Sequence, residues 1–273
     1  MKHLKVGFVG AGNMASSIVG GLLDQGLPPQ NIAVSDPSTE ALQRLLQLGE
    51  IGTSTDNQSV LAESDVVVLA VKPQHMRDVA LPLREPVAAS GALVISIAAG
   101  ITLGHLAAWL GADTPVVRCM PNTPALLRCG ASALYPAASV SDAQRELASA
   151  VLGAVGSVVW VDDEAQMDAV TALSGSGPAY LFLFMEAMAE AGEALGLPAD
   201  TSRALAVQTA LGAARMAAQD DLDLAELRRR VTSPGGTTER ALQHFEQAGL
   251  RNIVNDAMDA AAQRSRELAS ETG

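Results

Sequence analysis

The stretch Lys5-Val6-Gly7-Phe8-Val9-Gly10-Ala11-Gly12-Asn13-Met14-Ala15 decides the fold of this chain. It joins an apolar strand to a G-x-G-x-x-A turn and then to a helical pattern, which is typical of a dinucleotide-binding unit. Gly10 permits the tight turn, Gly12 lets the backbone approach a pyrophosphate, and Ala15 lets the helix pack closely on the strand. Free N–H groups and the dipole at the helix start favour the anion. Its position between strand and helix favours a dinucleotide site over a purely structural turn.

Short apolar runs alternate with helical patterns through the first half of the chain, which is typical of repeated βαβ units. The predicted strands are residues 5–9, 32–35, 66–71, 92–97 and 116–119. Several of these runs are continuously apolar, as expected of parallel strands that helices cover on both faces. Two further β-like segments, 132–135 and 157–161, flank an amphipathic helix at 142–152 and extend the sheet. We therefore predict an α/β fold with a doubly wound, mostly parallel Rossmann-type sheet over residues 1–162.

After residue 162 the strand signals disappear, and the pattern predicts an all-helical domain over residues 163–273. Its helices are expected to break at 175–178, 196–198, 220–221, 234–236 and 249. Residues 179–188, AYLFLFMEAM, are apolar nearly all round, whereas a helix with one face in water shows an apolar stripe. This segment is therefore expected to lie buried between helices or between subunits, because a monomer would expose a contiguous apolar patch.

The amino-acid composition limits which classes of binding partner and which cellular compartment are expected. With a formal net charge of −12, the chain would repel nucleic acids and anionic membranes, so neither is expected as a partner. Its apolar runs are too short for a bilayer, which takes about 20 residues, and the N-terminus does not resemble a signal peptide. Two cysteines are too few for a disulfide scaffold, which favours a cytoplasmic protein. The four histidines are isolated in the sequence and predict no metal site.

Two charged residues follow predicted strands at the sheet edge where α/β folds bind ligands. Asp36 ends the second strand, where an acidic residue bonds the adenosine ribose of NAD and would repel the 2′-phosphate of NADP. The sequence Asp36-Pro37-Ser38 also makes a good turn with a helix-capping side chain, and both interpretations stay open. Lys72 follows the strand at 66–71 and either faces a phosphate or lies in solvent at the rim.

Four stretches distinguish between the families that use this glycine turn. They are Ala70-Val71-Lys72-Pro73, Cys119-Met120-Pro121-Asn122-Thr123-Pro124, Ser174-Gly175-Ser176-Gly177-Pro178-Ala179-Tyr180 and Ser233-Pro234-Gly235-Gly236-Thr237-Thr238. In order and spacing, over essentially the whole chain, they resemble the pyrroline-5-carboxylate reductases, and the last two are highly specific to that family. The resemblance implies the final step of proline biosynthesis, in which a nicotinamide cofactor reduces the cyclic imine 1-pyrroline-5-carboxylate. It also implies a homodimer with intertwined helical domains, which some members assemble into larger rings of dimers.

The resemblance also implies the residues of the site. An NADPH-type cofactor is expected on the first domain, with contacts at Gly10, Ala11, Gly12, Asn13, Met14, Ser35, Asp36, Asn57, Ala70, Val71, Lys72, Pro73, Ala98, Ala99, Gly100 and Asn122. Substrate contacts are expected at Ser176, Gly177, Pro178, Ser233, Gly235, Gly236 and Thr237. Because many relatives lack an acid at the position of Asp36, the choice between NADPH (NADP) and NADH (NAD) stays open.

The distribution of lysine bears on the chemistry. Lysine occurs only at Lys2, Lys5 and Lys72, so the helical domain has none. Related hydroxyacid dehydrogenases use a lysine of that domain to handle the proton of an alcohol, and this role has no candidate here. An imine nitrogen is basic enough to be protonated near neutral pH, so a hydroxyl donor suffices, and Thr238 is the candidate catalytic residue. Backbone groups of residues 233–237 would receive the substrate carboxylate.

Competing interpretations exist for the motifs and for the function. Residues 233–238 would start a helix in any protein, because Pro-Gly-Gly is followed by threonine and then Glu239. Residues 174–180 would likewise open a helix with Pro178 at its first position, and we favour a dual role as pocket lining and helix start. The competing functions are a hydroxyacid dehydrogenase and a non-catalytic dinucleotide-binding protein with a helical interaction module.

Overall fold

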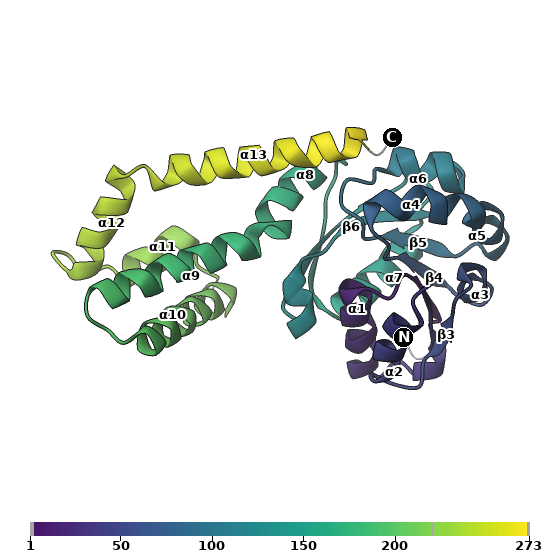
Figure 1. Ribbon diagram of the computed structural model, residues 1–273. Helices are drawn as coiled ribbons and strands as arrows, with labels where there is room; N and C mark the ends of the chain where they lie inside the picture. The colour runs from purple at the N-terminus through teal and green to yellow at the C-terminus, as the bar shows by residue number, and fades with distance from the viewer. Residues whose placement is uncertain (1–2, 220, 272–273) are drawn as a thin grey trace. The chain divides into compact units, whose positions relative to one another are not determined.

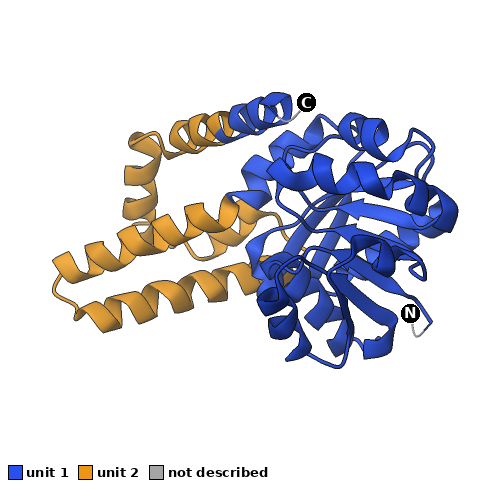
Figure 2. Cartoon of the chain, turned by 45° about the vertical axis from the view of Figure 1, so that its right-hand side comes forward, with its two compact units in different colours: residues 1–176, 261–273 blue, residues 177–260 orange. Residues whose placement is uncertain are grey.

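The computed structural model describes residues 3–219 and 221–271, which form two compact units (Figure 2). Residues 1–176 and 261–273 make up the first unit, and residues 177–260 make up the second. The sequence placed the domain boundary at 162, where the strand pattern ends. Residues 166–175 are helical but belong to the first unit, where Met167 and Ala172 are buried.

The first unit contains a sheet with the strand order β3-β2-β1-β4-β5-β6-β7-β8. Within the described sheet, neighbouring strands are parallel except β6 and β7, which pair antiparallel. The predicted doubly wound, mostly parallel sheet is therefore confirmed. The strands are β1 (Val6–Val9), β2 (Ile32–Ser35), β3 (Gly52–Ser54), β4 (Val66–Leu69), β5 (Leu93–Ser96), β6 (Val116–Met120), β7 (Gly130–Pro136) and β8 (Gly156–Trp160).

Helices cover both faces of this sheet (Figure 1), which explains the continuously apolar strands. Along β4, Val66 and Val68 pack into one core cluster, whereas Val67 and Leu69 pack into the other. Because side chains alternate between the faces of a strand, an apolar residue at every position means that both faces are dry. The helices are α1 (Asn13–Asp24), α2 (Thr39–Leu46), α3 (Asn57–Leu61), α4 (Pro73–Ala80), α5 (Arg84–Ser90), α6 (Leu103–Leu110) and α7 (Asp142–Gly153), with short 3-10 turns η1 (Pro29–Asn31), η2 (Leu81–Leu83) and η3 (Thr123–Leu127).

The remainder of the described chain is helical, as predicted. In the first unit, α8 (Gln166–Val170) continues into a π-helical segment, η4 (Thr171–Gly175). The helices that follow are α9 (Gly177–Ala194), α10 (Ala199–Gln219), α11 (Leu224–Arg230), α12 (Thr237–Gln247) and α13 (Leu250–Glu271), whose last part returns to the first unit. The breaks predicted at 175–178, 196–198, 234–236 and 249 are confirmed, whereas position 220 of the remaining break lies outside the described residues. Among residues 3–219 and 221–271, no helix is both long and apolar enough to span a membrane.

Helix α9 holds the apolar segment that was expected to be buried between helices or subunits. Its own chain does not bury it, because Leu181, Phe182 and Leu183 remain 64%, 63% and 66% exposed. Of the residues described in the second unit, only Ser202 and Ala206 are buried, and the others are half-buried or exposed. Burial between helices of the same chain was therefore wrong, and burial between subunits is the interpretation that remains.

Candidate active site

The glycine turn at the end of β1 has the geometry that its sequence predicts. Gly10 adopts a φ of +104°, and a Cβ there would lie 2.7 Å from the carbonyl oxygen of Ala70, so only glycine fits. A Cβ on Gly12 would meet nothing within 4 Å, and no side chain caps the start of α1. Ala15 is fully buried under the turn. The first N–H groups of α1 thus face open space, as an anion site requires.

Asp36 is bonded to this glycine turn. One carboxylate oxygen, Oδ2, accepts a hydrogen bond of 2.8 Å from the backbone N–H of Ala11, and Oδ1 accepts one of 2.8 Å from the N–H of Ser38. Ser38 in turn caps α2 through the N–H of Ala41. The turn and cap expected from Asp36-Pro37-Ser38 are therefore formed. The structure adds a contact that the sequence did not indicate, because the carboxylate also holds the turn in which a pyrophosphate would lie.

Most of the predicted cofactor residues lie at the carboxyl ends of parallel strands, which is the ligand-binding edge of such sheets. Asp36 follows β2, Ala70 follows β4, and Ala98 follows β5. Lys72 is exposed. It is the N-cap residue of α4, but its side chain makes no capping hydrogen bond, and Pro73 is the first residue of that helix. Ser35 departs from the prediction in one respect: it is fully buried, its hydroxyl donates to the carbonyl of Phe8, and its own carbonyl accepts a hydrogen bond of 2.7 Å from the N–H of Gly10. The remaining predicted residues at this edge are Asn57, Val71, Ala99, Gly100 and Asn122.

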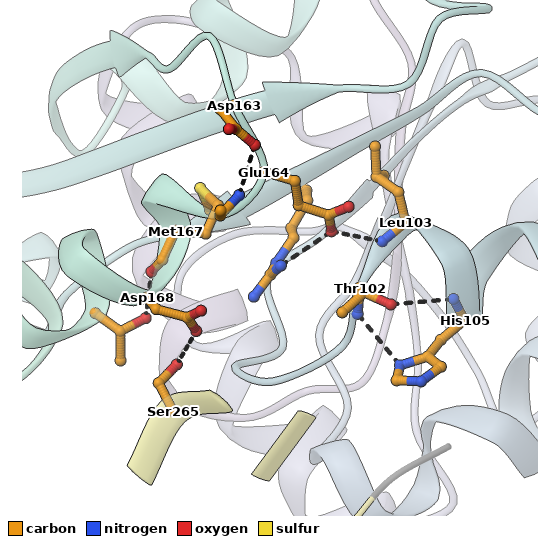
Figure 3. Close-up of polar contacts among 11 residues, drawn as sticks. Thr102, Leu103, His105, Asp163, Glu164, Met167, Asp168 and Ser265 are labelled. Carbon is orange, nitrogen blue, oxygen red and sulfur yellow. Dashed lines mark hydrogen bonds and ion pairs between the residues drawn. The ribbon is translucent and has the colours of Figure 1, made fainter. Parts of the chain in front are cut away.

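A buried ion pair holds the loop that follows β5. The Arg118 side chain is 6% exposed, and its Nη1 lies 2.9 Å from Oε1 of Glu164. The same oxygen accepts a hydrogen bond of 2.7 Å from the N–H of Leu103, the first residue of α6 (Figure 3). Sequence reasoning missed both partners, because a lone arginine in a strand and a lone glutamate in a loop form no local pattern. The pair joins β6 and the chain after β8 to the start of α6, which follows the predicted cofactor residues 98–100 in the chain.

The end of α13 packs over the same loop. The hydroxyl of Ser265, which is buried, donates a hydrogen bond of 2.7 Å to Asp168 of α8 (Figure 3). Gly100 has a φ of +75°, and a Cβ there would lie 3.5 Å from backbone atoms of Leu268 and Ala269. These contacts are within the first unit, so the last turns of the chain help to shape the edge of the sheet.

The stretch 174–180, whose residues 176–178 are predicted to contact the substrate, begins in the π-helical segment. The N–H of Ser176 donates to the carbonyl of Thr171 over 2.8 Å, a spacing of five residues. Asn122, in the loop after β6, donates from Nδ2 to the carbonyl of Ser174 over 3.0 Å. Its Oδ1 accepts a hydrogen bond of 2.9 Å from the N–H of Ala131. Pro178 is the second residue of α9, one position later than predicted.

The loop 233–238 forms the start of α12 in the second unit, so it does begin a helix, as one interpretation of its sequence predicted. Gly235 has a φ of +71°, and Gly236 is the N-cap. Two N–H groups expected to receive a carboxylate are already bonded: Gly235 donates to Glu239 over 2.7 Å, and Gly236 donates to the carbonyl of Ser233 over 3.0 Å. The N–H groups of Thr237 and Thr238 lie in the first helical turn, where backbone donors have no partner within the helix.

The cysteines offer no nucleophile in this region. Cys119 is fully buried in β6, and burial raises the pKa of its thiol far above the ordinary value. Cys129 is exposed and, like Cys119, is not in a disulfide. Cys119 is therefore an unreactive thiol in the native fold.

A parallel sheet with an open glycine turn, followed by a helical unit, defines the chain as a dinucleotide-binding oxidoreductase. Residues 5–100 match the family described as NADP oxidoreductase coenzyme F420-dependent, and residues 164–268 match the family described as pyrroline-5-carboxylate reductase dimerisation. The chain belongs to the pyrroline-5-carboxylate reductase family, as the four sequence stretches predicted. It is 54% identical to the pyrroline-5-carboxylate reductase of Pseudomonas aeruginosa over 100% of both chains.

Solved structures agree with this assignment. A pyrroline-5-carboxylate reductase from Coxiella burnetii shares 43% identity with a TM-score of 0.95, over 98% of this chain and 99% of that one. Plasmodium falciparum pyrroline carboxylate reductase, whose structure has NADP bound, shares 28% identity with a TM-score of 0.85, over 98% of this chain and 99% of that one. The match to a dimerisation domain also agrees with the exposed apolar surface of α9.

Proposed function

We propose that this chain reduces 1-pyrroline-5-carboxylate to L-proline, the final step of proline biosynthesis. The observation that carries the proposal is the pairing of an open glycine turn in the first unit with the loop 233–238 at the start of α12, in a chain that matches this family from end to end. The bound dinucleotide would supply a hydride to the imine carbon. The protein has to hold the cofactor, fix the substrate carboxylate and place a hydroxyl group beside the ring nitrogen.

The geometry of the first unit fits the binding of a nicotinamide dinucleotide. The uncapped first turn of α1 would hold the pyrophosphate, and the open space where Gly12 has no Cβ would let the phosphates approach the backbone. The loop 98–100, which leads to the start of α6 that the Arg118–Glu164 pair holds, would lie along the nicotinamide side of the sheet edge. We propose NADPH as the cofactor, with NADH also used because Asp36 is an acid at the end of β2.

The second unit would bind the substrate. Since the N–H groups of Gly235 and Gly236 are bonded within the loop, the carboxylate would dock on the N–H groups of Thr237 and Thr238 and on the positive end of α12. The conformation of the loop at Ser233, Gly235 and Gly236 would turn the first turn of α12 toward the substrate carboxylate. Ser176, Gly177 and Pro178 would line the pocket at the start of α9.

Thr238 would serve as the catalytic hydroxyl. It lies in the first turn of α12, its side chain is exposed, and no hydrogen bond among the described residues engages its hydroxyl. With the carboxylate fixed on the adjacent N–H groups, the hydroxyl reaches the ring nitrogen and steadies the developing amine. A lysine acid is unnecessary, because the imine nitrogen is protonated near neutral pH.

The proposed assembly is a homodimer, with a larger ring of dimers as the further assembly that the resemblance implies. A second subunit over α9 would cover Leu181, Phe182 and Leu183, which one chain leaves more than half exposed. We also propose a cytoplasmic location, because Cys119 and Cys129 are unpaired. Light scattering would distinguish the masses of a dimer and of a ring, and a monodisperse, active monomer would contradict the proposed assembly.

The reaction is tested by following loss of the reduced nicotinamide absorbance with 1-pyrroline-5-carboxylate as substrate. We expect NADPH oxidation with this imine and none with a panel of keto acids. Turnover of keto or hydroxy acids without imine turnover would identify a hydroxyacid dehydrogenase. Cofactor binding without turnover of either class would identify a non-catalytic dinucleotide-binding protein.

A further inference from the structure

The amide side chain of Asn122 joins three segments of the first unit. Its Oδ1 accepts from the N–H of Ala131 in β7, and its Nδ2 donates to the carbonyl of Ser174 in the π-helical segment. The first of these bonds fixes the orientation of the amide, because a backbone N–H can pair only with the oxygen. The second bond therefore runs from an N–H of Asn122 to Ser174, and both ends of the amide are committed to protein partners.

The bond to Ser174 replaces one that the helix itself cannot form. In an α-helix the carbonyl of residue 174 accepts from the N–H four residues later, which is position 178. That position is Pro178, which has no N–H. The carbonyl of Ser174 therefore lacks its ordinary donor at the point where η4 gives way to α9. Asn122 supplies the missing donor from a loop 52 residues earlier in the chain.

A second contact joins the same two segments. A Cβ on Gly175 would lie 2.6 Å from the terminal methyl carbon of Met120, so that side chain already fills the space beside Gly175. Met120 and Asn122 belong to one of the four sequence stretches that carry the family resemblance, and Ser174 and Gly175 belong to another. The two stretches are thus parts of one packed structure.

We propose that Asn122 is a positioning residue for the substrate turn 174–178. Its Nδ2–H holds the Ser174 carbonyl that Pro178 leaves without a donor, and this sets the path of the chain through Ser176 and Gly177 into α9. The inference rests on the proposed function, because it assigns the turn to the substrate. It differs from the role expected for Asn122 from the family resemblance, in which the side chain contacts the cofactor.

The proposal is tested by coupling Asn122 to Pro178. Asn122→Ala should lower kcat/KM for 1-pyrroline-5-carboxylate by about tenfold or more, while the Kd for NADPH changes by less than about twofold. In a Pro178→Ala background, residue 178 has an N–H that can donate to Ser174. The further loss caused by Asn122→Ala should then shrink to about threefold or less. Equal losses in both backgrounds would overturn the proposal, and so would a parallel rise in the Kd for NADPH.

Two further variants guard against a general loss of structure. Asn122→Asp keeps the side-chain size and the acceptor for Ala131 but presents an oxygen to the Ser174 carbonyl, so it should show the same substrate-side loss. Wild-type kinetics in this variant would refute the idea. Gln25→Ala removes another amide-to-carbonyl bond, to Gly153, at the far end of α1, and should leave kinetics unchanged. If the wild-type chain reduced no imine, the proposed function would fail, yet non-additive melting temperatures of the Asn122 and Pro178 variants would still test the bond.

Discussion

The Thr238→Val substitution tests whether Thr238 acts in catalysis or only at the start of a helix. The structure predicts that it leaves the stability of the fold unchanged. Valine keeps the volume and the branched shape of threonine but removes the hydroxyl. That hydroxyl is exposed on the first turn of α12, and Gly236 rather than Thr238 is the N-cap. Folding therefore loses no hydrogen bond, and the free energy of unfolding should change by less than about 0.5 kcal/mol.

The expected kinetic effect is much larger. A hydrogen bond to a charged group contributes about 1.5–3 kcal/mol, and each tenfold change in rate corresponds to about 1.4 kcal/mol. Loss of the bond to the protonated ring nitrogen should therefore lower kcat/KM for 1-pyrroline-5-carboxylate by roughly 10- to 100-fold. The Kd for NADPH should stay unchanged, because that site belongs to the glycine turn.

Steady-state kinetics and a thermal melt of the same preparation check this prediction, and Thr237→Val provides the matched control. Thr237 is the neighbouring exposed threonine of the same helical turn, and valine there keeps its backbone N–H for the substrate carboxylate. We expect the control to lose less than about threefold in kcat/KM. The reasoning is refuted if Thr238→Val retains wild-type kinetics, or if both variants lose activity equally.

Three further predictions follow from other parts of the structure. Asp36→Asn keeps an oxygen for the N–H of Ala11 but removes the charge, so the ratio of kcat/KM for NADPH to that for NADH should rise by about fivefold, matching ~1 kcal/mol of repulsion. An unchanged ratio would show that Asp36 acts only on the turn. Glu164→Ala leaves the buried Arg118 guanidinium without its carboxylate and should lower the free energy of unfolding in urea by about 3–5 kcal/mol. Arg118→Met should lower it less, because the Glu164 side chain is 27% exposed and still accepts the hydrogen bond from the N–H of Leu103. Equal losses would contradict this asymmetry. Burial raises the pKa of Cys119 and keeps it protonated, so a thiol reagent near neutral pH should label Cys129 in the native protein and reach Cys119 only after denaturation. Rapid native labelling of Cys119 would show that the strand opens readily.

Local patterns in the sequence determined the element types and the glycine turn. The apolar run at Val66–Leu69 predicts a strand covered on both faces, and Gly10 predicts a turn that a Cβ would block, because both depend on sterics within a few residues. The helix breaks after residue 162 follow from glycine and proline for the same reason. Strand β3 was missed, because Gly52-Thr53-Ser54 is short and lies at the sheet edge, where no apolar run is needed.

Only the tertiary structure decided which distant residues meet. The Asp36 carboxylate contacts Ala11, Glu164 contacts Arg118, and Asn122 contacts Ser174, over separations of 25, 46 and 52 residues. Such pairs have no period or spacing that marks them, because they depend on how strands are ordered in the sheet and how loops pack at its edge. The carbonyl that Pro178 leaves without a donor is visible in the sequence as a missing N–H. Which side chain supplies that donor is decided by the fold, because the loop after β6 lies beside the π-helical segment.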